Sequence, residues 1–118
     1  MKIRIKGDAL RYRLSMSDVA NLAHKGFLQE QIGFAGQPLI YAVIAADSDE
    51  LSAEYLNHTI TLFIPRVLVA ELADTGKVGF EANSGPLRLL IEKDFTCLDN
   101  VEEDQSDNYP NPLAIQKN

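Results

Sequence analysis

The sequence predicts an α+β fold built from a duplicated ββαββ unit, with about eight antiparallel strands in one sheet or an open barrel. The first observation is a repeated segment: residues 19–26 and 69–76 share the pattern V-A-x-L-A-x-x-G. Its apolar positions lie three and four apart, which places them on one face of a short helix that stops at Gly. The second is that apolar-polar alternation, typical of strands, flanks both copies.

The third observation is that turn signals recur at matching offsets. Gly7-Asp8 corresponds to Asn57-His58 at an offset of fifty, and Pro38 corresponds to Pro86 at an offset of forty-eight. Coincidence among common residues is the alternative, but the agreement of turns, helices and stops favours duplication. We therefore expect one α+β domain over residues 1–98, with repeat halves at about 1–46 and 51–93. Residues 99–118 form an acidic, partly flexible tail that Tyr109 could dock.

The chain begins with a predicted β-hairpin. Residues 2–6 and 9–14 alternate in polarity around Gly7-Asp8, a dipeptide typical of two-residue hairpin loops. The register that follows places Ile5 opposite Leu10 and Ile3 opposite Tyr12 on the apolar face. It places Arg4 opposite Arg11 and Lys2 opposite Arg13 on the other face.

A helix is predicted from Ser15, with Asp18 completing a capping box, and its buried stripe consists of Met16, Val19, Leu22 and Ala23. Strands follow over 27–34 and 39–46, and the second is apolar on both sides, which indicates a strand covered on both faces. The second half repeats this order after a polar link over 47–50. It contains strands over 52–56 and 59–64, a helix opened by Pro65, and strands over 78–82 and 87–93.

Composition limits the possible functions. The chain has 118 residues, a net charge of -6 and a pI near 4.8, which argues against general nucleic-acid binding. The apolar runs are far shorter than the ~20 residues that span a bilayer. The N-terminus carries Lys2, Arg4 and Lys6 where a signal peptide needs an apolar stretch. With one cysteine there is no internal disulfide. We expect a cytoplasmic protein, monomer or weak dimer, without nucleic-acid or membrane partners.

The candidate binding residues are Lys2, Arg4, Lys6, Arg11 and Arg13. Like charges directly opposite in an antiparallel pair are destabilising by ~0.2–1 kcal/mol, so a counter-charge is expected. It could be an anionic ligand such as a phosphate or carboxylate, or the acidic tail, because residues 1–13 carry a net +4 and residues 94–118 a net -5. The third possibility is a solvated hairpin.

Other candidates are weaker. The acidic tail lacks the spacing and Gly of a calcium loop, so we predict no metal site. Cys97 has neither His24 nor His58 placed beside it by the sequence, which favours a small buried thiol over a nucleophile. No phosphate-binding loop, dinucleotide fingerprint or hydrolase motif occurs. We therefore predict no catalytic residue and no cofactor.

Two resemblances are visible. The segment from Met1 to Gly26, the run Glu92-Lys93-Asp94-Phe95 and residues 103–112 resemble a family of small, uncharacterised bacterial proteins. The order of strands and helices is similar to the CYTH-type triphosphate tunnel enzymes, whose barrel holds polyanions among inward-facing Arg and Lys. Of their opening E-x-E-x-K strand only Lys6 is matched, because Lys2 and Arg4 replace the metal-binding glutamates.

The sequence thus favours a non-enzymatic binding or interaction domain whose partner is an unknown protein or a small anionic ligand. The alternative is a phosphate-handling enzyme of the tunnel type. The direction of the cations distinguishes them: convergence into a cavity with Glu54, Arg88 and Glu92 favours a small-molecule binder or enzyme. A flat outer face favours a protein partner or the tail.

Overall fold

The computed structural model describes residues 1–95 and 106–110, and these contain eight strands and two helices. The elements follow in the order β1 (Lys2–Lys6), β2 (Ala9–Leu14), α1 (Met16–Lys25), β3 (Phe27–Ile32), β4 (Leu39–Ala46), β5 (Ser52–Leu56), β6 (Thr59–Pro65), α2 (Arg66–Asp74), β7 (Gly79–Ser84) and β8 (Leu87–Lys93). The α+β class and the repeated strand-strand-helix-strand-strand order are confirmed. Strand β3 ends two residues earlier than predicted, and β7 begins one residue later and runs two residues further.

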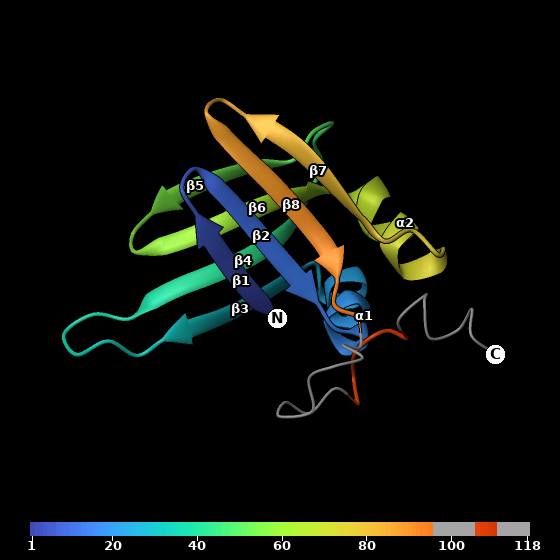
Figure 1. Ribbon diagram of the computed structural model, residues 1–118, viewed down its shortest axis with the longest axis horizontal. Coiled ribbons are helices and arrows are strands. Elements are labelled where there is room, and N and C mark those ends of the chain that lie inside the picture. The colour runs from blue at the N-terminus through green and yellow to red at the C-terminus, as the bar shows by residue number, and fades with distance from the viewer. Residues whose placement is uncertain (96–105, 111–118) are drawn as a thin grey trace.

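The strands form two four-stranded sheets, not the single sheet or open barrel that the sequence predicts. Sheet A has the order β1-β2-β8-β7 and sheet B the order β3-β4-β6-β5. The sheets face each other with their strands crossing obliquely (Figure 1). Two short helices could not cover the apolar face of one eight-stranded sheet, whereas two sheets bury their apolar faces against each other.

Pairing within each sheet is mixed, so the prediction of antiparallel strands throughout was wrong. Strands β2 and β8 pair in parallel, and so do β4 and β6. Each parallel pair joins one half of the chain to the other, and a hairpin from each half completes the sheet. Parallel partners far apart in the chain cannot be read from hairpin signals, which report neighbours only.

The registers follow the repeat. Ala9 pairs with Arg88, and Thr59 pairs with Ile40 at the corresponding place in the other sheet. The first members of these pairs differ by fifty positions and the second by forty-eight, which are the two offsets in the sequence. Sheet A therefore corresponds to sheet B with the halves exchanged, and this supports duplication.

The core lies between the sheets and beneath the helices. Its buried members form a single cluster that includes Tyr12, Leu14, Val43, Leu62, Ile64, Leu89 and Ile91 from the strands and Val19, Leu22, Val69 and Leu72 from the helices. Val19 and Leu22 are thus confirmed as core residues, as are Val69 and Leu72 of the second helix. The prediction was wrong for Met16, which is 44% exposed, and for Ala23, which is also exposed. The helices contact each other at one end of the sandwich, while the β1–β2 and β5–β6 turns lie away from them (Figure 1).

The helix ends differ between the halves. Helix α1 has the predicted capping box between Ser15 and Asp18 and stops at Gly26, whose φ of 84° is left-handed. Helix α2 differs from the prediction at both of its ends. At its start, Pro65 is the N-cap residue and not the first helical residue, and at its other end the helix stops at Thr75, which is extended, and not at Gly76. The hydroxyl and the N–H of Thr75 both donate to the carbonyl of Glu71, which replaces a left-handed stop.

Strand β4 faces the core on one side only, although Ala42 on its outer side is also buried. Val43 and Ala45 face the core, but Ile44 on the outer side remains 36% exposed and lies beside Phe27 of β3, which is 53% exposed. The described residues supply no layer over this face, so the prediction of cover on both faces was wrong. Within these residues, neither helix has the length and apolar character needed to cross a membrane.

Candidate anion-binding face

The predicted basic residues lie together on the outer face of sheet A. Alternation along paired strands sends every second row of side chains outward. The three outward rows are Lys2, Arg13, Glu92 and Gly79; Arg4, Arg11, Leu90 and Glu81; and Lys6, Ala9, Arg88 and Asn83. These rows hold six cations and two carboxylates. We call this surface the basic face.

The hairpin register is the one predicted from sequence. Arg4 lies opposite Arg11, and Lys2 lies opposite Arg13. Arg11 and Arg13 share a counter-charge, Glu92 of β8, which pairs in register with Arg13. Its Oε1 atom lies 3.1 Å from Nε of Arg11 and 3.6 Å from Nε of Arg13. One carboxylate therefore serves two guanidinium groups, and it comes from a strand that the sequence did not place beside the hairpin.

A depression of about 240 Å³ occupies the centre of the basic face. Its lining consists of Arg4, Lys6, Ala9, Arg11, Arg88 and Leu90. Arg88 donates to Oε2 of Glu81 from Nη2 at 2.8 Å, and both side chains are more than half exposed. Exposed pairs of this kind contribute ~0–1 kcal/mol, so a ligand can compete for the guanidinium. Arg4 and Lys6 form no salt bridge with any carboxylate within residues 1–95 and 106–110.

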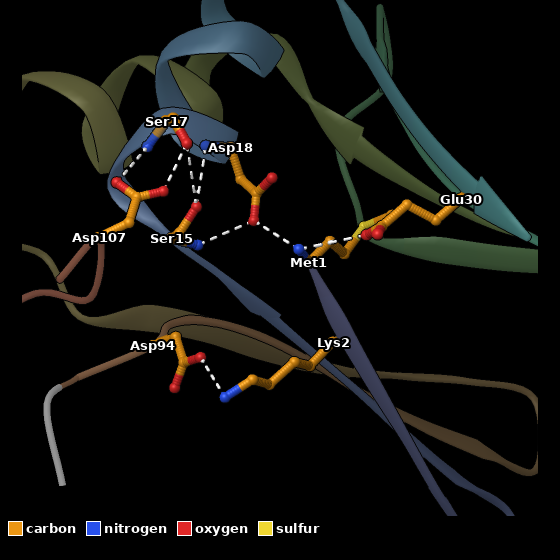
Figure 2. Close-up of polar contacts among 8 residues, drawn as sticks. All are labelled: Met1, Lys2, Ser15, Ser17, Asp18, Glu30, Asp94 and Asp107. Carbon is orange, nitrogen blue, oxygen red and sulfur yellow. Dashed lines mark hydrogen bonds and ion pairs between the residues drawn. The ribbon is translucent and has the colours of Figure 1, made fainter. Parts of the chain in front are cut away.

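Lys2 and Arg13 lie in the row beyond the depression. Nζ of Lys2 is 2.9 Å from Oδ2 of Asp94, at the point where β8 has ended (Figure 2). Arg13 shares Glu92 with Arg11. The five predicted cations thus share one face of sheet A, but only Arg4, Lys6 and Arg11 of these line the depression.

The described part of the tail docks elsewhere. Residues 106–110 lie against the start of α1, where Asp107 accepts hydrogen bonds from the hydroxyl and the N–H of Ser17 (Figure 2). The Ser17 hydrogen bond is the main reason that the pKa of Asp107 is lowered from its usual value. A carboxylate suits this position because a helix N-terminus carries partial positive charge. The other tail carboxylates, Asp99, Glu102, Glu103 and Asp104, and also Cys97, lie outside the described residues.

Tyr109 anchors the docked segment. Its N–H donates to the carbonyl of Asp94 at 2.8 Å, and its ring lies 5.8 Å from that of Phe95. Lys93 lies under the same ring at 4.9 Å and donates from Nζ to the carbonyl of Thr75 at 3.0 Å. Burial lowers the pKa of Lys93. These contacts tie the chain after β8 to the end of α2, so Lys93 has a structural role.

The α-amino group of Met1 lies near a second pair of carboxylates. It is 2.8 Å from Oδ2 of Asp18 and 3.2 Å from Oε2 of Glu30 (Figure 2). Burial lowers the pKa of this amino group, but the two carboxylates outweigh burial and the pKa is raised overall. Asp18 also accepts from the N–H of Ser15. The start of β1 is therefore tied to the cap of α1.

Among the described residues, the core cluster between the sheets contains no lysine or arginine. The buried cluster between the sheets is formed by hydrophobic side chains, and burial raises the pKa of Tyr12, the fully buried phenol among them. Its hydroxyl donates to the carbonyl of Ile60 at 3.4 Å. A polyanion tunnel needs several cations that point inward, whereas the six cations of the basic face point outward. Among the described residues no group of three His, Cys, Asp or Glu side chains is placed to hold a metal ion.

Comparison with known proteins agrees with the sequence resemblance. The model of a family of unknown function, DUF7009, matches residues 1–113. The chain belongs to DUF7009. Neither the curated proteins nor the solved structures contain a match. The DUF7009 match covers both halves and the docked tail segment, so the basic face lies within the region that defines the family.

Sequence reasoning did not include Arg88 and Glu81 among the candidate binding residues, although it named Arg88 as a residue that would join the cations in a cavity. Arg88 enters the depression because β8 pairs in parallel with β2, and Glu81 follows it from β7. The internal repeat held the necessary signal. Had β2 been paired with the strand that follows Pro86, the outward row of Lys6 and Ala9 would have included Arg88.

Proposed function

We propose that this protein is a binding domain that takes a small anionic ligand on the basic face. The observation that carries the proposal is the depression between Arg4, Lys6, Arg11 and Arg88. Three of these four are arginines, whose planar fork can hold a carboxylate or phosphate through two hydrogen bonds. Their arrangement on a sheet gives them fixed spacing, which a mobile loop would not.

The charge of the depression supports this proposal. Arg11 forms a salt bridge with Glu92, and Arg88 forms one with Glu81. Arg4 and Lys6 have no carboxylate partner in the described part of the chain. An incoming anion would meet two available cations first and then compete for two that are held in exposed ion pairs. Because such pairs contribute little, the competition favours a ligand with more than one negative charge.

Binding is favoured over catalysis by what surrounds the depression. The described residues of its lining include no Ser, Thr, Cys or His that could act as nucleophile or base. His24 lies near the end of α1, and His58 lies in the β5–β6 turn. The docked segment, residues 106–110, contacts α1 through Asp107. None of these five residues lines the depression.

Calorimetric titration with tripolyphosphate tests this proposal. The full chain should bind, with an affinity that falls as salt rises, because salt screens the attraction between exposed charges. Arg4→Gln should weaken binding about tenfold, since a charge-assisted hydrogen bond contributes ~1.5–3 kcal/mol. Lys25→Gln is the matched control: it removes the same charge from the end of α1, away from the basic face. Equal loss in both variants, or no binding by the wild type, would refute a site at the depression.

A further inference from the structure

The floor of the depression is apolar, although its rim is cationic. Leu90 and Ala9 both point outward from sheet A and line the depression. Ala9 lies between Lys6 and Arg88 in one row, and Leu90 lies beside Arg11 in the next. Both side chains are half-buried by their neighbours. A fully hydrated inorganic anion gains nothing from contact with such a floor, whereas a ligand with a carbon skeleton does.

The rim has the dimensions of a small ring compound with several charged groups. Neighbouring strands lie ~4.8 Å apart, so Lys6 and Arg88, two strands apart in one row, have backbones roughly 10 Å apart. Arg4 and Arg11 face each other in the next outward row, ~7 Å along the strands. Guanidinium groups also stack on aromatic faces, which a phosphate or sulfate does not offer.

The fold itself does not require this combination. The corresponding face of sheet B carries other residues at the same places, as the matching registers show. The four cations Arg4, Lys6, Arg11 and Arg88 correspond there to Glu54, Leu56, Thr61 and Ile40. The same strands therefore form without cations, so the cationic rim around Leu90 is a property of sheet A alone.

We propose that the ligand is a planar organic polyanion, a flat ring that bears two or more carboxylate, phosphate or sulfonate groups. Its ring lies on Leu90 and Ala9, and its anionic groups reach Arg4, Lys6, Arg11 and Arg88. This inference rests on the proposed function and adds the chemical class of the ligand. It predicts selectivity between anions of equal charge, which electrostatic attraction alone does not give.

Two tricarboxylates test the inference: trimesate, which has a benzene ring, and citrate, which does not. Calorimetry on the full chain at moderate salt should show trimesate binding at least tenfold tighter than citrate, the scale of one well-packed apolar contact. Leu90→Thr, which keeps a residue suited to strands, should remove most of the difference between the two affinities. Leu56→Thr is the control, because it alters an exposed leucine of sheet B.

A measurement on the wild type alone does not depend on whether the variants fold. In the wild type, nuclear Overhauser contacts should connect the ring protons of trimesate to the methyl groups of Leu90. Equal affinity for both tricarboxylates with no such contacts would overturn the organic-ligand inference and leave anion binding in place. Binding of neither tricarboxylate nor tripolyphosphate would overturn both. Trimesate selectivity that survives in Leu90→Thr would place the ring elsewhere and overturn the inference as well.

Discussion

Truncation of Leu72 to alanine should be among the most costly single changes in this chain. Leu72 lies on α2, is 1% exposed and belongs to the shared core cluster. The change removes about three methylene equivalents at roughly 0.8 kcal/mol each, or ~2.4 kcal/mol of transfer free energy. The cavity left behind brings the expected loss to ~2–5 kcal/mol. Because a domain of this size has ~5–15 kcal/mol of stability, a substantial fraction would be lost.

The corresponding leucine in the first half provides the sharper test. Leu22 is also 1% exposed, so Leu22→Ala should cost a similar amount if both helices are anchored in one core. Urea denaturation followed by circular dichroism measures the free energy of unfolding, and the control Leu56→Ala, at a position that is 59% exposed, should stay within about 0.5 kcal/mol of wild type. A loss below about 1 kcal/mol for either core leucine would refute the shared core.

Three further changes have definite expected outcomes. Glu92→Gln removes the carboxylate held by Arg11, so tripolyphosphate affinity should rise several-fold in calorimetry while stability changes by less than ~1 kcal/mol; weaker binding would contradict this. Gly79→Ala should cost ~1–3 kcal/mol in urea melts, because a Cβ there would lie 2.8 Å from Cα of Glu92, and a neutral result would contradict the close pairing of β7 and β8. Because the pKa of Asp107 is lowered in the folded protein, its carboxylate stabilises the folded state above the unfolded pKa near 3.8. This stabilisation is lost as pH falls through the folded pKa. Acid should therefore shift the amide signal of Ser17 in wild type but not in Asp107→Asn, and equal shifts in both would refute the contact.

Local features were the predictable part of this structure. The alternation around Gly7-Asp8 determined which residues of β1 and β2 face each other, and the observed register agrees at Arg4 and Arg11. The capping box of α1 was equally visible, because Ser15 and Asp18 interact over one helical turn. Such signals depend on neighbours in the chain, which a single sequence contains.

Long-range pairing was the part that could not be predicted. The sequence shows that residues 87–93 form a strand, but not that β8 lies parallel to β2 with Ala9 opposite Arg88. The depression, the counter-charge Glu92 and the outward position of Leu90 all follow from that one pairing. The two-sheet arrangement also depends on this pairing. Strand β8 pairs with the free edge of β2, along which a single eight-stranded sheet would have continued to the other strands.

The most direct test of the central claim is to locate a bound anion. Titration of isotope-labelled protein with tripolyphosphate, followed by NMR of the Arg and Lys side chains, reports which cations the ligand contacts. If the anion binds on the basic face, the side-chain NMR signals of Arg4, Lys6, Arg11 and Arg88 should shift and saturate. The signals of Arg66 and Lys25 should not change. Shifts at Arg66 or Lys25 of the same size, or shifts that grow without saturation at all cations, would contradict it.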